Sequence, residues 1–291
     1  TSVNRTEDQA VGKKSLAVTT NPMASKEAKP LPLSSRNRSS IGPSSVESPE
    51  SQPQIVNNGS VFHPLFYMGL LSEGNIPKPI GVYSEKDLTV SMDSIIRGLS
   101  NTEDWNARIA SLQSLQGLTV GDGSEFDSFI PLLKSIHELI SVQISDLRSV
   151  VCKEACRTVA IIARKLGSQF AVLADFWLPV LFKLLGLKIQ VMSSAADRCV
   201  RIILTSCPIG YPKVLILLIE NTVSKIPILR KNMVEYLCLC CTLWKSEVVM
   251  KNFGGIKQAI KTCLTDADPG TRKATRHLFW VLKSKNNSYR S

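Results

Sequence analysis

Apolar residues recur at helical spacing from about residue 88 onward. In the run Val150, Val151, Ala155, Val159, Ile162 and Leu166, most steps are three or four residues. This spacing places the side chains along one face of a helix. The run between Phe176 and Leu185 is more densely apolar, as expected for a helix that is covered on two sides. No useful length of sequence alternates between apolar and polar residues, so the pattern predicts an all-α fold.

Short polar breaks divide these helices into pairs. The breaks inside the pairs centre near Asp104, Asp146, Lys188, Lys225 and Asp266, at spacings of 42, 42, 37 and 41 residues. HEAT and armadillo repeats recur at about 40–47 residues. The expected pairs are 88–99 with 105–117, 125–143 with 147–166, 169–186 with 190–206, 212–223 with 228–244, and 247–264 with 270–284. Since one pair cannot bury its apolar face alone, we expect all five to stack into a HEAT-repeat α-solenoid.

The N-terminal part of the chain has a different composition. Residues 1–60 contain twelve Ser and six Pro, and no Phe, Trp or Tyr. Such a segment cannot bury enough apolar surface to offset its chain entropy, so it is predicted to be a disordered leader. Residues 61–82 are predicted to be a linker, whose apolar stretch forms a short helix docked on the first repeat. The first residue is Thr1, which suggests a fragment of a longer protein.

The net charge of +11 is concentrated outside the leader. Residues 1–60 carry a net charge of +2, which leaves +9 for the remainder. A basic folded surface predicts an acidic partner, which could be a nucleic acid, an anionic membrane or an acidic protein. No apolar run reaches the roughly 18–20 residues that a membrane span needs, and no membrane interaction is expected.

Residues that could carry chemistry form no catalytic constellation. The eight Cys lie mostly in apolar helical runs and are expected to pack as small hydrophobes in a reducing compartment. The cluster at 238–241 lacks a second Cys/His pair at zinc-site spacing, so no metal is expected. The three His are far apart, and Asp266 and Asp268 are better explained as helix caps. We therefore expect neither enzymatic activity nor a cofactor.

The turns inside the pairs are the informative positions. In a solenoid they line one edge, although they are about 40 residues apart in sequence. Each of the five turns contributes a cation. Charge is common at solvated helix ends, and Trp105 could instead continue the apolar stripe of Ile109 and Leu112. Five basic turns out of five nevertheless favour a binding face. The predicted contact residues are Trp105, Arg108, Arg148, Lys153, Lys188, Lys225, Arg230, Lys231, Arg272, Lys273 and Arg276.

Four segments carry a resemblance to a known family. They are Tyr83-Ser84-Glu85-Lys86-Asp87-Leu88, Glu103-Asp104-Trp105-Asn106-Ala107-Arg108, the stretch DLRSVVCKEAC at 146–156, and Asp266-Ala267-Asp268 followed by Arg272 and Arg276. In this order and spacing they resemble the second TOG domain of the CLASP family of microtubule-associated proteins. The resemblance covers roughly residues 83–284, and the stretch at 146–156 is its most specific part.

The resemblance implies an arched TOG domain at 83–291 that binds tubulin and microtubules through the edge of turns. In that family the Trp of the first turn contacts β-tubulin, and basic residues of later turns reach toward α-tubulin. CLASP proteins suppress catastrophe and promote rescue, so the expected location is the cytoplasm and the cytoskeleton, at microtubules, spindle and kinetochore. An additional N-terminal helix of the family would correspond to residues 61–71. A TOG domain has six repeats and only five are found, so truncation before the sixth is expected. The third turn, at 186–190, has only one cation, which weakens the expected contact there.

Two other functions stay open, a HEAT adaptor for another acidic protein and a nucleic-acid binder. Nucleic-acid recognition usually interleaves aromatic residues with cations, and this edge offers only Trp105, so no nucleic acid is expected. The tetrapeptide Ser224-Lys225-Ile226-Pro227 fits the S-x-I-P pattern by which disordered segments bind microtubule end-binding proteins. Because it stands between two predicted helices, it is interpreted as a turn. Binding to end-binding proteins is expected only through regions outside this domain.

Overall fold

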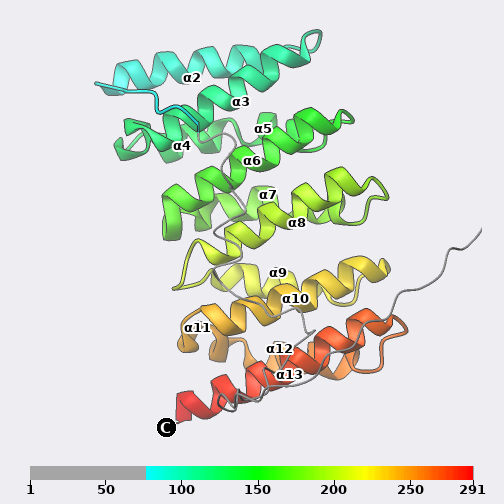
Figure 1. Cartoon of the computed structure of the whole chain (residues 1–291). Coiled ribbons are helices and arrows are strands. Elements are labelled where there is room, and N and C mark those ends of the chain that lie inside the picture. Colours follow the sequence, from blue (N-terminus) through cyan, green and yellow to red (C-terminus); the bar gives the residue numbers. More distant parts are fainter. Residues whose placement is uncertain (1–76, 291) are drawn as a thin grey trace, which may run out of the picture. The chain divides into compact units, whose positions relative to one another are not determined.

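The computed structural model describes residues 77–290, which form helices and no strand (Figure 1). The predicted leader at 1–60 and the predicted docked helix at 61–71 lie outside these residues. The helices are α2 (Glu85–Leu99), α3 (Trp105–Val120), α4 (Phe129–Ser135), α5 (His137–Ile144), α6 (Ser149–Leu166), α7 (Ala171–Leu185), α8 (Gln190–Thr205), α9 (Pro212–Asn221), α10 (Pro227–Leu243), α11 (Ser246–Lys251), α12 (Phe253–Cys263) and α13 (Pro269–Arg290). Two 3₁₀ turns, η2 (Asp122–Glu125) and η3 (Gly167–Phe170), join neighbouring helices.

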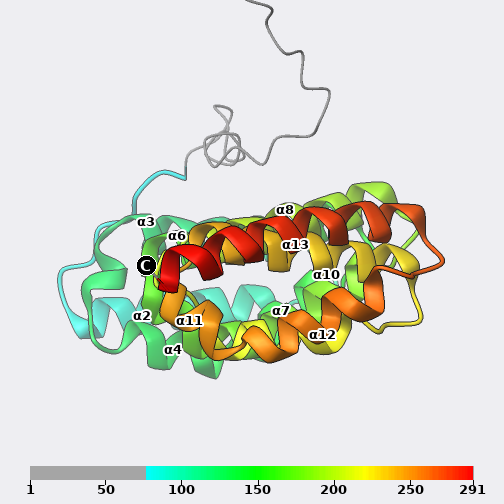
Figure 2. The ribbon, with the colours of Figure 1, turned by 90° about the horizontal axis from the view of Figure 1, so that it is seen from below.

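The helices form antiparallel pairs that stack one on the next (Figure 1). The second helices α3, α6, α8, α10 and α13 contact one another in sequence and make one layer. The first helices make the other layer, in which α5 contacts α2 and α7, and α9 contacts α7 and α12. Figure 2 shows the two layers from below. The prediction of an all-α solenoid of HEAT-like helix pairs is therefore confirmed.

Buried aromatic side chains join the third and fourth helix pairs to the pairs before them. The Trp177 indole N–H donates to the His137 carbonyl at 3.2 Å, and the Trp244 indole N–H donates to the Leu204 carbonyl at 2.8 Å. The Tyr211 hydroxyl donates to the Gly167 carbonyl at 2.7 Å. All three rings are buried. They fill the space between pairs while their polar atoms satisfy carbonyls at helix ends.

Two helices predicted as single elements are each divided in two. The predicted helix at 125–143 is broken at Ile136 into α4 and α5, and the one at 247–264 is broken at Asn252 into α11 and α12. Both break residues have ψ angles near zero, at 7° and 12°. The pieces on either side bury apolar residues in the same core, so the apolar periodicity continues through the break. The last helix is also longer than predicted and reaches Arg290.

The chain preceding α2 packs against α3. The Ile80 N–H donates to the Gly117 carbonyl at 3.0 Å, and Val82 is buried. Two glycines permit this close approach, Gly117 within α3 and Gly121 at the C-cap of α3. A Cβ at Gly117 would lie 2.8 Å from the Ile80 side chain, and one at Gly121 would lie 2.2 Å from the Ile80 carbonyl oxygen. The C-terminal part of the predicted linker is therefore docked on the first helix pair.

One segment meets the length and hydropathy criteria for crossing a membrane, contrary to the expectation from the sequence. This segment, Ser149–Leu185, comprises α6, η3 and α7. Within the fold α6 packs in the layer of second helices and α7 in the layer of first helices, and 50% of the apolar window is buried. Core helices of this kind meet the same criteria, and here the apolar side chains form the middle of the stack.

Candidate binding edge

The turns inside the five helix pairs lie along one edge of the stack (Figure 1). They are residues 100–104, 145–148, 186–189, 222–226 and 264–268, here numbered turn 1 to turn 5. Together with the first two helical turns that follow each of them, they are called the turn edge. Each second helix begins at this edge, so five helix N-termini, whose first N–H groups lack an acceptor within the helix and carry partial positive charge, lie along it.

Turn 1 presents a partly exposed tryptophan. The Asn101 side chain accepts hydrogen bonds from the N–H groups of Glu103 and Asp104, at 3.0 and 2.8 Å. Asp104 then caps α3 by accepting from the Asn106 N–H at 2.8 Å. This network fixes Trp105 as the first residue of the helix, where its side chain is 36% exposed. The core tryptophans Trp177 and Trp244, by contrast, are buried. Trp105 is therefore open to a partner.

Turn 2 is built around a buried ion pair. The guanidinium of Arg108 donates to Asp146 at 2.6 Å and to the Gln143 side chain at 2.8 Å. Both members of the ion pair are almost fully buried, with side-chain exposures of 8% and 9%. Asp146 also accepts from the Arg148 N–H at 2.7 Å. Arg108, predicted to contact a partner, instead lies inside the fold and joins the first helix pair to the second.

The same contacts set the protonation of Asp146. Burial favours the neutral carboxyl, but the hydrogen bonds from the Arg148 N–H and from Arg108 favour the carboxylate. Together with the charges of the two guanidinium groups they outweigh burial and lower the pKa of Asp146. The carboxylate therefore stays ionised at neutral pH and holds the backbone of turn 2.

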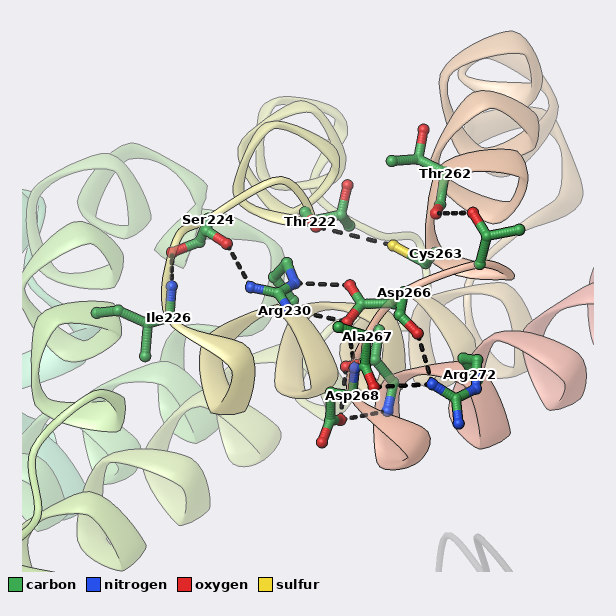
Figure 3. A network of polar contacts seen from close by, with 12 residues as sticks. Thr222, Ser224, Ile226, Arg230, Thr262, Cys263, Asp266, Ala267, Asp268 and Arg272 are labelled. Carbon is green, nitrogen blue, oxygen red and sulfur yellow. Dashed lines mark hydrogen bonds and ion pairs between the residues drawn. The ribbon is translucent and has the colours of Figure 1, made fainter.

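Turn 5 repeats this arrangement (Figure 3). Arg230 binds Asp266 through two hydrogen bonds of 2.6 and 2.8 Å, and its third nitrogen donates to the Ser224 carbonyl at 2.8 Å. Asp266 accepts from the Asp268 N–H at 2.8 Å, and the bonds from Arg230 lower the pKa of Asp266. Arg230 is thus directed inward, and its side chain is only 15% exposed. Arg230 was predicted to be a surface contact, but in the structure it joins the fourth helix pair to the fifth.

Arg272 also uses part of its hydrogen-bonding capacity within the fold. Its guanidinium donates to the carbonyls of Asp266 and Ala267 at 2.6 and 2.8 Å, which closes turn 5 on itself (Figure 3). Asp268 caps the following helix by accepting from the N–H and hydroxyl of Thr271, at 2.6 and 2.8 Å. This capping role of the turn 5 carboxylates agrees with the expectation from the sequence.

The remaining predicted cations are accessible on the turn edge. Arg148 is 55% exposed and lies 3.8 Å from Asp146, while Lys231 is 38% exposed and lies 3.6 Å from Glu235. The others have exposed side chains and form no ion pair with another described residue; these are Lys153, Lys188, Lys225, Lys273 and Arg276. Every turn from the second to the fifth therefore presents at least one free positive charge.

Exposed aliphatic residues of the turn edge were missed by the sequence analysis. Leu147 is 91% exposed beside Arg148 in turn 2. Turns 3 and 4 and the helix starts behind them expose further residues, namely Leu187, Ile189, Val191, Val223, Ile226 and Ile228. For two of them, Ile189 and Ile226, the sequence signal is an aliphatic residue at the N-cap of a helix, where Asp, Ser or Asn is the usual choice.

The described residues contain no group of three or more His, Cys, Asp or Glu that could hold a metal ion. All eight cysteines are free and buried, which confirms that they pack as small hydrophobes. Burial raises the pKa of Cys238 and of Cys241 to about 12, so these thiols are protonated at neutral pH.

A stack of helix pairs with a basic and partly apolar edge of turns defines an α-solenoid of the TOG kind. Two solved chains share this fold. One, from a study of microtubule plus-end tracking by XMAP215, CLIP-170 and EB1, has a TM-score of 0.51 at 17% identity and covers 75% of this chain and 86% of its own. The other, from work on TOG–tubulin binding specificity, has a TM-score of 0.52 at 14% identity, with coverages of 72% and 88%.

The sequence comparison gives the family. The sequence model of the CLASP N-terminal family matches residues 88–288, and the chain belongs to this family. The CLIP-associated protein of Arabidopsis thaliana is 30% identical over 201 residues, and CLIP-associating protein 1 of Xenopus tropicalis is 27% identical over 206 residues. These alignments cover 68% and 70% of this chain but only 14% of each relative. The predicted resemblance is confirmed at the level of the family.

Proposed function

We propose that this chain is a module that binds tubulin and microtubules through the turn edge and thereby regulates microtubule dynamics. The observation that carries the proposal is the alignment of Trp105 with exposed cations from turns 2 to 5 along one edge. A surface of this kind attracts an acidic protein, and tubulin is the partner of proteins that share its fold. Related solved structures are described as showing tubulin recruitment by TOG domain arrays and TOG–tubulin binding specificity.

The proposed contact set differs from the set expected from the sequence. It keeps Trp105, Arg148, Lys153, Lys188, Lys225, Lys231, Lys273 and Arg276, whose side chains are exposed or partly exposed. Arg108, Arg230 and Arg272 support the contact indirectly, because their hydrogen bonds hold the turn backbones in place. In this arrangement the partner meets a pre-formed surface, which reduces the entropy lost on binding.

The further consequences rest on the family. We propose that the chain corresponds to a second TOG domain, suppresses catastrophe and promotes rescue, and acts on cytoplasmic microtubules, including those of the spindle and the kinetochore. Growth of single microtubules should show fewer catastrophes and more rescues when the protein is added. Unchanged frequencies at saturating protein would restrict its role to binding.

A sedimentation experiment tests the proposed partner directly. The protein is mixed with taxol-stabilised microtubules and, in parallel, with free tubulin, DNA and RNA. We expect co-sedimentation with microtubules and co-elution with tubulin on size exclusion, and no shift of nucleic acid. Binding to nucleic acid in place of tubulin, or to neither, would contradict the proposal and favour a HEAT adaptor for another partner.

A further inference from the structure

Two helices of the turn edge begin with a residue that is poorly suited to a helix start. Ile189 is the N-cap of α8 and Ile226 is the N-cap of α10, and neither offers a side-chain hydrogen bond to the helix. At turns 1 and 5 the same position holds Asp104 and Asp268, which both cap their helices. Isoleucine ranks far below Asp, Asn and Ser at this position. Turns 3 and 4 therefore lack the stabilising side-chain cap that turns 1 and 5 have; at turn 2 the N-cap is Arg148, which also makes no side-chain cap.

The side chains of these two isoleucines are also partly exposed to solvent. Ile189 is 51% exposed and Ile226 is 43% exposed. The second residue of each helix, Val191 and Ile228, is likewise 50% and 45% exposed. An isolated exposed aliphatic residue is ordinary on a protein surface. Several such residues at consecutive turns form an apolar surface, which usually marks a binding site.

Turns 3 and 4 are in direct contact, so their aliphatic residues belong to one surface. A Cβ at Gly186 of turn 3 would lie 3.1 Å from Cδ1 of Ile226 in turn 4. The absence of a side chain at Gly186 thus lets Ile226 lie against the neighbouring turn. The resulting central apolar patch consists of Leu187, Ile189, Val191, Val223, Ile226 and Ile228.

Positive charge surrounds the central apolar patch. Arg148 and Lys153 lie on the side of turn 2, and Lys273 and Arg276 lie on the side of turn 5. Lys188 and Lys225 are exposed within turns 3 and 4 themselves. The complementary surface is one with an apolar centre and carboxylates around it. The acidic protein partner of the turn edge can provide both, whereas a polyanionic backbone lacks the apolar centre.

We propose that the central apolar patch is the hydrophobic contact of the turn edge with tubulin. It supplies a part of the affinity that does not depend on ionic strength, while the cations of turns 2 and 5 supply the part that does. This inference rests on the proposed function and adds to it an apolar contact at the centre of a basic edge.

The test replaces both N-cap isoleucines by serine. Serine is a favourable N-cap, so the Ile189→Ser/Ile226→Ser protein should melt at the same temperature as the wild type or higher. Removing this apolar contact area should weaken binding of purified tubulin about tenfold or more, measured by fluorescence anisotropy. The factor should be the same at low and at high salt. The conservative variant Ile189→Val/Ile226→Val should retain most of the affinity.

A matched control lies away from the turn edge. Ile209 is 50% exposed, close to the exposure of Ile189, but lies between α8 and α9, in a connection between helix pairs. Ile209→Ser should leave tubulin binding unchanged. Should the double serine variant melt below the wild type, Val191→Ser/Ile228→Ser removes apolar area from the same patch without changing an N-cap.

The outcomes separate the two proposals. Equal affinity of wild type and patch variants, together with weakened binding by Arg148→Glu/Lys153→Glu, overturns the central apolar patch and leaves the proposed function standing. A loss factor that grows as salt is lowered also overturns it, because the contact would then be electrostatic. Failure of the wild type to bind tubulin overturns both.

Discussion

Turns 2 and 5 differ from turns 3 and 4 in how the turn itself is held to the preceding helix pair. At turns 2 and 5, an arginine three residues after one helix start binds an aspartate three residues before the next, as in Arg108–Asp146 and Arg230–Asp266. At turn 3 the equivalent positions hold Cys152 and Leu187, and at turn 4 they hold Ser193 and Ser224. Turns 2 and 5 are thus fixed to the preceding helix pair by buried ion pairs, and turns 3 and 4 are not. The third and fourth pairs are joined farther along their second helices, where Arg201 of α8 binds Glu235 of α10 at 2.7 Å.

This difference shows how one repeated architecture supports two kinds of surface. The ion pairs at turns 2 and 5 fix the backbones that present Arg148, Lys273 and Arg276. Such pairs are costly to break but hold a unique geometry when fully hydrogen-bonded. The central turns instead carry aliphatic residues at the N-cap and at the second position of the helix that follows. Turns 2 to 5 all contribute charge, and the exposed aliphatic side chains are most numerous at the two central turns.

The largest expected effect comes from removing one partner of an ion pair at turn 2 or turn 5. Asp146→Ala leaves the Arg108 guanidinium buried without its carboxylate, so the free energy of unfolding should fall by about 3 kcal/mol. Urea denaturation followed by circular dichroism measures it. Ser224→Ala, at the equivalent position of turn 4, removes one neutral hydrogen bond and should cost less than about 1 kcal/mol. Equal losses of unfolding free energy for the two variants would show that turns 2 and 4 are held equally firmly.

The next largest effect is expected at turn 1, where the measured quantity is the affinity for tubulin. If the partly exposed Trp105 is an interface anchor, Trp105→Ala should weaken tubulin binding by about 2 kcal/mol or more, measured by anisotropy. Trp177→Ala, in the buried core, should lower the free energy of unfolding by about 3–5 kcal/mol. Trp105→Ala should lower it by clearly less. A drop in melting temperature as large as that of Trp177→Ala would assign Trp105 to the core.

Charge reversal at turn 2 should weaken binding without unfolding. Arg148→Glu/Lys153→Glu places two carboxylates on a basic edge, so affinity for microtubules should fall about tenfold or more at physiological salt. Exposed substitutions shift stability by only about 0.5 kcal/mol, so the helical circular-dichroism spectrum should not change. Co-sedimentation at several salt concentrations measures the effect, which should shrink as salt rises. Unchanged affinity would show that Arg148 and Lys153 do not contribute to microtubule binding.

Acid should destabilise turns 2 and 5. The pKa values of Asp146 and Asp266 are lowered in the folded protein, whereas an unperturbed Asp has a pKa of about 3.9. Their contribution to stability is therefore present above about pH 4 and is lost as pH falls through the lower folded pKa values. The melting temperature should decrease on acidification in this range, and less steeply for Asp266→Asn. Parallel curves for variant and wild type would show that other groups control acid stability.

The sequence predicted the helix pairs because each pair buries a regular apolar face, and that periodicity is local. It did not predict the breaks at Ile136 and Asn252, because the apolar pattern runs through both. It also placed Arg108 and Arg230 on the surface. Their partners lie 38 and 36 residues away, and only the stacking of neighbouring pairs brings the charges together. The sequence showed which residues of the edge are basic, but it did not show which of them already bind a carboxylate or a carbonyl within the fold.

The smallest expected effect concerns the tetrapeptide Ser224-Lys225-Ile226-Pro227, which fits a pattern recognised in extended peptides. In the structure its backbone begins a helix. The Ile226 N–H donates to the Ser224 hydroxyl at 3.3 Å, the Ile226 carbonyl accepts from Leu229 and Arg230, and Pro227 is the first residue of α10. Binding as an extended strand would require these hydrogen bonds to break and turn 4 to open. Ile226→Asn/Pro227→Asn should therefore leave affinity for an isolated end-binding domain unchanged, measured by calorimetry with this chain. A clear loss of affinity would show that turn 4 opens in solution, and the central turns would then be mobile in addition to lacking the ion pairs of turns 2 and 5.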